Sequence, residues 1–146
     1  TVNTPLQYAA VEAYSGDYEN YKNKTRKILE GVGNYAYNNL KSNKILLTPP
    51  EGAFYLMPEF LGTKFKNSNH LCEKILEDTG VALLPGSDFG FEPKKMIARL
   101  SYTDFDGENF LNSLEDNGNL TDGMVEKFAP NVVEGIKKLS NWAKKI

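Results

Sequence analysis

The chain has 146 residues, of which 40% are hydrophobic and 25% charged, and its formal net charge is −2. This is the composition of one globular domain that can bury its own core, with no basic face for nucleic acid. No apolar run is long enough to span a membrane, and no signal peptide opens the chain. A single cysteine excludes an internal disulfide framework, so we expect a cytoplasmic protein.

Two helices are predicted at the start of the chain. Thr4 followed by Pro5 is typical of a helix start, with threonine as the N-cap and proline in the first turn. Ser15–Asp17 ends this helix and caps the next. Apolar residues then recur at three- and four-residue steps, which predicts a second helix over residues 17–40.

Glycines and tyrosines stand out in these two helices. Gly31 and Gly33 each cost a helix interior about 1 kcal/mol relative to alanine, so they indicate a bend or a close approach by another element. Five tyrosines lie between Tyr8 and Tyr35. At helical spacing they favour amphipathic packing over a stacking or recognition surface.

Two short strands are predicted next. Residues 45–47 form the first, and the second spans Glu51–Pro58, which a glycine opens and a proline closes. Gly52 would let the backbone come close to another group, and Phe54 or Tyr55 would offer a flat ring to a bound molecule. All three could instead be core residues of the strand, and for Tyr55 this interpretation is favoured.

A further helix is predicted from a cap at Asn67-Ser68 to about Thr79, with Gly80 as its stop. Its predicted buried face carries Leu71, Ile75 and Leu76. Cys72 lies in the same apolar pattern, which favours a small buried side chain over a nucleophile. The lone histidine, His70, excludes a His-rich metal site, so no metal is expected.

The middle of the chain predicts two more strands, joined by a glycine-containing loop. Val81–Leu84 is an apolar run ended by Pro85 and predicts a buried strand. Gly86 and Gly90 follow, but their spacing matches no nucleotide-binding loop, so a phosphate cradle is rejected. Residues 96–102 alternate loosely and predict the second strand.

Arg99 lies in the middle of this last strand, between apolar neighbours. A permanently charged guanidinium costs several kcal/mol in apolar surroundings unless it is paired. Its planar fork of donors suits a carboxylate held by two hydrogen bonds. The alternatives are a solvated face of the strand or an ion pair with an acidic residue of the same chain.

The C-terminal part is predicted to be helical. One helix begins at Asp106 or Gly107, and the acidic, glycine-containing stretch 115–123 is interpreted as a surface insertion without chemistry. Thr121 caps a further helix, in which Pro130 either makes a kink or starts a new helix. An apolar stripe then runs to the C-terminus: Val132, Val133, Ile136, Leu139, Trp142 and Ala143.

Four short motifs follow one another along the chain. They are T-P-L-Q-Y-A-A-V-E-A at residues 4–13, P-E-G-A-F-Y at 50–55, T-G-V-A-L-L-P-G at 79–86 and R-L-S-Y at 99–102. In this order and spacing, residues 1–114 resemble the C-terminal small domain of the pyridoxal-phosphate aminotransferases of the aspartate aminotransferase type (fold type I, class I/II).

The resemblance implies an α+β fold in which a short mixed or antiparallel sheet packs against helices, here with an extra C-terminal helical insertion. Residues 1–146 would form one domain. The resemblance also implies that Arg99 binds the α-carboxylate of an amino-acid substrate, and that Gly52 and Phe54 line the substrate pocket. The parent reaction would transfer an amino group between an amino acid and a 2-oxo acid, with aspartate, alanine and aromatic amino acids all open as substrates.

The family's lysine that bonds the cofactor lies in an S-x-S-K motif, which does not occur here. The resemblance therefore implies a C-terminal part of a longer, homodimeric aminotransferase, cut by proteolysis or cloned as a piece. Pyridoxal 5'-phosphate would bind to the missing large domain, and this chain alone would be inactive. The alternatives are a non-catalytic module that binds a small carboxylate and a protein-interaction domain.

Overall fold

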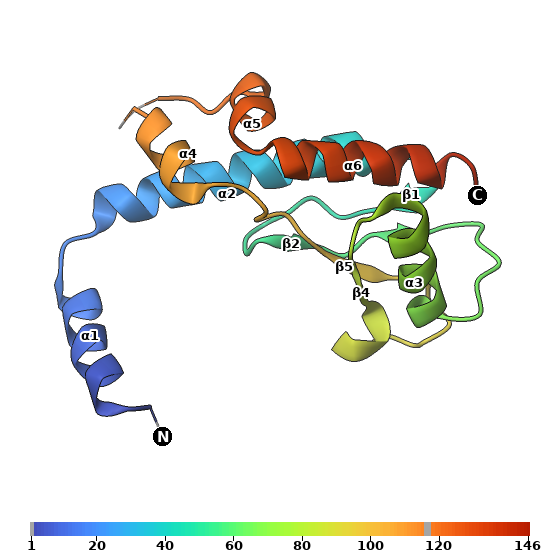
Figure 1. The fold of residues 1–146 in the computed structure, drawn as a ribbon, viewed down its shortest axis with the longest axis horizontal. Helices are drawn as coiled ribbons and strands as arrows, with labels where there is room; N and C mark the ends of the chain where they lie inside the picture. The colour runs from blue at the N-terminus through green and yellow to red at the C-terminus, as the bar shows by residue number, and fades with distance from the viewer. Residues whose placement is uncertain (1, 116–117) are drawn as a thin grey trace.

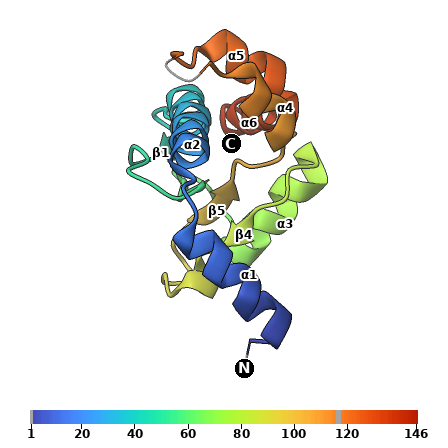
Figure 2. The same cartoon turned by 90° about the vertical axis from the view of Figure 1, so that its left-hand side faces the viewer.

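The computed structural model describes residues 2–115 and 118–146. Its longest helices, α2 (Glu19–Leu40) and α6 (Pro130–Ala143), pack along each other and run in the same direction. The strands lie on one side of this pair, with α3 (Ser68–Thr79) beside them (Figure 1 and, seen end-on, Figure 2). None of the described helices is long and apolar enough to cross a membrane.

The strands form two small antiparallel sheets. In one, β1 (Ile45–Leu46) pairs with β3 (Glu59–Phe60). In the other, β5 (Ala98–Ser101) lies between two neighbours, β2 (Tyr55–Leu56) and β4 (Leu84–Pro85). The predicted α+β architecture is thus confirmed, and its sheets are antiparallel throughout the described residues.

Alternation along β5 decides which side chains face the core. Ala98, Leu100 and the following Tyr102 are buried, while Arg99 and Ser101 point to the other face. The predicted strand Val81–Leu84 is wrong in its position and burial. Only Leu83 of that run is buried, and Leu84, which begins β4, is 45% exposed because its pairing partner is Arg99 on the open face.

The second predicted helix is confirmed, and its glycines mark close packing. The side chain of Leu120 lies against Gly31, and Tyr102 and Pro50 lie against Gly33. A side chain at either position would displace these neighbours, which explains why glycine occurs inside α2.

The capping predictions for α3 are confirmed at both ends. Asn67 accepts a 2.9 Å hydrogen bond from the amide of His70, and Gly80 ends the helix with φ +73°. Leu71 and Ile75 are fully buried as predicted, but Leu76 is 49% exposed. Leu76 follows Ile75 directly, so its side chain lies about 100° further around the helix axis and points away from the core.

The first helix, α1 (Thr4–Ser15), has no buried residue and extends away from the body of the molecule (Figure 1). Its N-cap is Asn3, which accepts from the amide of Leu6, so the prediction of Thr4 as the cap is wrong by one residue. Most of the tyrosines predicted to pack are exposed: Tyr8, Tyr14, Tyr18 and Tyr21 are between 40% and 92% exposed, and Tyr35 is buried.

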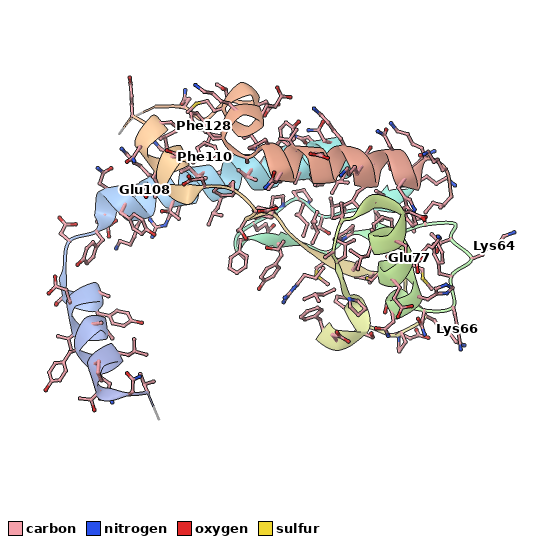
Figure 3. All side chains as sticks on the ribbon, in the orientation of Figure 1. Lys64, Lys66, Glu77, Glu108, Phe110 and Phe128 are labelled. Atoms are coloured by element: carbon pink, nitrogen blue, oxygen red, sulfur yellow. The ribbon has the colours of Figure 1, made fainter. Side chains whose placement is uncertain are left out.

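The C-terminal region follows the predicted helices. Asp106 caps α4 (Gly107–Ser113), and Thr121 caps α5 (Asp122–Phe128). Pro130 starts a new helix, α6, rather than bending α5. Rings from α4 and α5, Phe110 and Phe128, stack at 5.3 Å (Figure 3).

Residues 116 and 117, within the predicted insertion 115–123, lie outside the described part of the chain. The predicted stripe on α6 is confirmed, since Val132, Val133, Ile136, Leu139, Trp142 and Ala143 are all buried.

Candidate functional site

Arg99 lies half-buried on the open face of the central strand β5, and two aromatic rings flank it. The guanidinium carbon Cζ is 4.1 Å from the ring centroid of Phe89 and 5.2 Å from that of Tyr55. Among the described residues, no Asp or Glu forms an ion pair with Arg99. The donors of the guanidinium are therefore available to an acidic group from outside the chain.

The loop that carries Phe89 is a short 3₁₀ helix, η1 (Gly86–Phe89). The amide of Gly86 donates a 2.8 Å hydrogen bond to the carbonyl oxygen of Ile97, and a Cβ at Gly86 would lie 2.8 Å from the same oxygen. Gly90 then reverses the chain at φ +85°, a conformation that favours glycine. Gly86 thus lets η1 lie close to the start of β5, and Gly90 ends η1.

Gly52 and Phe54 line a hollow of about 480 Å³ between the loop before β2 and helix α2. Tyr102 and Arg26 also line it, and Phe54 is 47% exposed. A Cβ at Gly52 would meet no atom within 4 Å, so no contact inside this chain requires glycine there.

Arg99 does not line this hollow, and Tyr55 links the two sites. The rings of Phe54 and Tyr55 meet edge to face, with centroids 5.2 Å apart. Tyr55 is 39% exposed and contacts Arg99, so its favoured interpretation as a core residue is wrong. Its register partner is Ser101, which lies on the same open face as Arg99. Once this pairing is known, the alternation of side chains along β5 places Tyr55 on the open face as well.

The loop next to the hollow has an unusual backbone. Ala53 adopts φ +62°, the left-handed region that non-glycine residues rarely enter. The hydroxyl of Tyr102 donates a 3.2 Å hydrogen bond to the carbonyl oxygen of Ala53, and the amide N–H of Tyr102 donates a 3.1 Å hydrogen bond to the carbonyl oxygen of Phe54. These bonds fix the loop that presents Phe54.

Cys72 and His70 were predicted to have no chemical role. Cys72 is buried as predicted, and burial, with smaller contributions from Asp88 and Glu73, raises the pKa of its thiol to about 11. The thiol is therefore protonated at neutral pH and is a poor nucleophile. His70 packs edge to face on the ring of Phe65.

Fold and site together define a small α+β domain that presents an arginine with no acidic partner among the residues that the structure describes. A family model described as aminotransferase class I and II matches residues 1–114. The chain belongs to the class I and II aminotransferases.

The match covers only part of the length of each relative. The aspartate aminotransferase of Thermotoga maritima is 38% identical over 101 residues, which are 69% of this chain and 24% of that protein. The aspartate/prephenate aminotransferase of Cereibacter sphaeroides is 33% identical over 110 residues, 68% of this chain and 26% of that protein. The chain thus spans about a quarter of the length of these relatives.

Solved structures support the fold. An alanine aminotransferase from Pyrococcus furiosus matches with a TM-score of 0.72 and 24% identity, over 99% of this chain and 30% of that one. The aspartate aminotransferase structure from Thermotoga maritima matches with a TM-score of 0.63 and 24% identity, over 98% of this chain and 29% of that one. Both likenesses extend beyond residue 114, where the family model ends.

Proposed function

We propose that residues 1–146 form the C-terminal domain of an aminotransferase, and that Arg99 binds the α-carboxylate of its amino-acid or 2-oxo-acid substrate. One observation carries the proposal. Arg99 is half-buried at the centre of a sheet, and among the described residues no acidic side chain neutralises it. Arg99 also lies in the R-L-S-Y motif, one of the motifs by which the chain resembles the family.

Arg99 would orient the substrate by two parallel hydrogen bonds to the two carboxylate oxygens. Fixing both oxygens sets the direction of the bonds at Cα, which positions the Cα hydrogen for removal. Phe54, in the loop before the neighbouring strand β2, would provide an apolar wall, and Gly52 would leave space beside it. The specificity for the substrate side chain lies outside these residues.

Family members depend on pyridoxal phosphate, which acts as an electron sink when it is bound. The described residues do not fit this cofactor. No lysine lines the hollow beside Phe54, and its charged residues are Arg26, Glu30 and Glu51, so acidic side chains outnumber the one positive group there. The cofactor would belong to a part of the enzyme outside this chain.

Two further features support a place within a larger enzyme. The chain spans about a quarter of its relatives, and helix α1 leaves large apolar side chains exposed, among them Leu6, Tyr8 and Val11. Both are accounted for if a large domain packs on α1 and brings the cofactor to Arg99. The complete enzyme would be a homodimer through its large domains.

The test is a kinetic comparison in the complete protein, assayed with aspartate, alanine and aromatic amino acids. Arg99→Leu should lower kcat/KM at least about 100-fold, since it leaves a desolvated carboxylate unpaired. Arg99→Lys should retain only part of the parent kcat/KM, because an ammonium group cannot form the two parallel hydrogen bonds of a guanidinium. Lys95→Gln removes one exposed positive charge four residues away and is the matched control. Retention of activity in Arg99→Leu within a few-fold would overturn the proposal.

The chain alone provides a second test. Reduction with borohydride in the presence of pyridoxal phosphate should give no specific lysine adduct, and one defined labelled lysine would contradict this. Calorimetry with dicarboxylates should show no binding tighter than about 1 mM, roughly −4 kcal/mol. Tighter binding by the isolated chain would favour a non-catalytic carboxylate-binding module.

A further inference from the structure

We propose that Phe89 and Tyr55 are positioning residues for Arg99, which hold the guanidinium in place and leave its donors free for a carboxylate. The inference rests on the proposed function of Arg99 and extends it to two aromatic side chains. Both rings lie within the distance at which an arginine and an aromatic face attract each other, 4.1 Å for Phe89 and 5.2 Å for Tyr55.

The two rings reach Arg99 from opposite neighbours of its strand. Tyr55 belongs to β2, which pairs with one edge of β5, and its register partner is Ser101, two residues after Arg99 on the same face. Phe89 ends η1, which directly follows β4 on the other edge of β5. Arg99 is thus restrained from both sides of the central strand.

Aromatic faces restrain an arginine differently from an acidic partner. An Asp or Glu beside Arg99 would accept its N–H groups and neutralise its charge, which would compete with a substrate carboxylate. A ring attracts the cation through its face, and the N–H donors of the planar guanidinium point outward in the plane of the group. The rings of Phe89 and Tyr55 therefore act as a clamp, which limits the freedom of the Arg99 side chain and keeps its donors available.

The position of Phe89 is itself fixed by the backbone. The Gly86 amide bond to Ile97 ties the start of η1 to β5. The hydroxyl of Ser68, a fully buried residue at the start of α3, donates to the hydroxyl of Ser87 at 3.3 Å. Because η1 is held at both β5 and α3, Phe89 is placed by rigid elements and not by a free loop.

The chain offers a direct spectroscopic test, because it contains only two arginines, Arg26 and Arg99. With ¹⁵N-labelled arginine, the Nε–H signal of Arg99 should lie upfield of that of the exposed Arg26, owing to the ring currents of its neighbours. Phe89→Leu should move the Arg99 signal toward that of Arg26, and Phe89→Tyr should restore it. Tyr55→Leu should act in the same way, with Tyr55→Phe as its conservative partner.

Phe91 is the matched control, since its ring is 38% exposed against 40% for Phe89 and, within the described residues, it makes no ring contact with Arg99. Phe91→Leu should leave the Arg99 signal unchanged. An Arg99 signal that is unmoved by both Phe89→Leu and Tyr55→Leu would overturn the clamp, whatever the function of Arg99.

Kinetics of the complete protein then distinguish the two proposals. Phe89→Leu and Tyr55→Leu should each lower kcat/KM by about 3- to 30-fold, the range expected for a cation–π contact, with rescue by Phe89→Tyr and Tyr55→Phe. If Arg99→Leu lowers kcat/KM but neither leucine variant does, the positioning role is wrong and the proposed function stands. If Arg99→Leu has no effect, the proposed function itself fails, and the positioning role that rests on it fails as well.

Discussion

The hydroxyl of Tyr102 lies against Gly33 of helix α2 so closely that a Cβ at position 33 would be 2.8 Å from its oxygen. The same hydroxyl donates to the carbonyl oxygen of Ala53, whose φ of +62° is unfavourable for an alanine. A glycine in a helix thus makes room for a tyrosine that holds the loop beside the hollow. Three segments far apart in the sequence depend on this one side chain.

Tyr102→Phe removes only the hydroxyl and is expected to destabilise the fold by about 1 kcal/mol, the usual net contribution of one hydrogen bond. Chemical denaturation of the isolated chain measures this. Thr103→Val, which removes an exposed hydroxyl from the neighbouring residue, is the control and should change stability by less than about 0.5 kcal/mol. Equal stability of Tyr102→Phe and the parent chain would show that the bond does not hold the loop.

Gly33→Ala should destabilise the chain, although alanine at an unhindered helix site gains about 1 kcal/mol over glycine. The added methyl group would meet the Tyr102 hydroxyl at 2.8 Å and Pro50 Cγ at 3.3 Å. Gly135→Ala in α6 is the matched control, because its nearest contact is an ordinary 3.8 Å to Val81, and it should be neutral or stabilising. In the Tyr102→Phe background the cost of Gly33→Ala should fall, and strict additivity in this double-mutant cycle would contradict the contact.

The sequence predicted the elements whose signals are local. The Asn67 and Gly80 caps, the start of α6 at Pro130 and the period of α2 all depend on residues within a few positions of each other. Arg99 could be singled out because a charge between apolar neighbours needs a partner. Its neighbours Phe89 and Tyr55 could not, since their contact depends on the pairing of β5 with two other strands.

The predictions from sequence were wrong where the burial of a residue depends on which other part of the chain packs against it. The sequence of α1 is rich in apolar residues but does not show whether anything in this chain covers them, and Tyr14 is 92% exposed. The run Val81–Leu84 has the composition of a buried strand, yet Leu84 pairs with Arg99 on the open face. The strand predicted over Glu51–Pro58 shortens to Tyr55–Leu56, because the left-handed Ala53 breaks its extended backbone and no residue there signals this.

The exposed tyrosines of the N-terminal segment should contribute nothing to the stability of the isolated chain. Tyr14→Ala is expected to change the free energy of unfolding by less than about 0.5 kcal/mol. Tyr35→Ala, at a 4% exposed site whose hydroxyl donates to Glu126, should cost about 3 kcal/mol or more. Thermal or urea unfolding of the two variants measures the difference, and a comparable loss for Tyr14→Ala would mean that α1 is covered within this chain or by a second copy.

Cys72 should resist thiol reagents in the folded chain. Burial raises the pKa of its thiol to about 11, so the reactive thiolate is scarce at pH 7–8, and the side chain is only 7% exposed. Labelling with an aromatic disulfide should be slow in buffer and complete within minutes in denaturant. An exposed cysteine introduced as Lys94→Cys in a Cys72→Ala background gives the rate for an accessible thiol. Equal labelling rates for the two cysteines would contradict the buried position.

Asp78 links α3 to α6 and should give the fold a dependence on acidic pH. The ammonium of Lys74, 2.7 Å from Oδ1, and the indole N–H of Trp142, 2.8 Å from Oδ2, lower the pKa of this carboxyl group. Because the pKa is lower in the folded than in the unfolded state, the contribution to stability is complete above about pH 4 and is lost as the pH falls further.

Asp78→Asn should therefore destabilise the chain at pH 6, and the difference from the parent chain should shrink at pH 3. Trp142 is the only tryptophan, so its fluorescence reports unfolding at this contact. Glu77→Gln is the control on the same helix, since Glu77 is 69% exposed and lies 3.4 Å from the same lysine. Exposed ion pairs contribute little, so Glu77→Gln should have almost no effect at either pH. A difference between Asp78→Asn and the parent chain that stays constant from pH 6 to pH 3 would show that the charge of Asp78 does not stabilise the contact between α3 and α6.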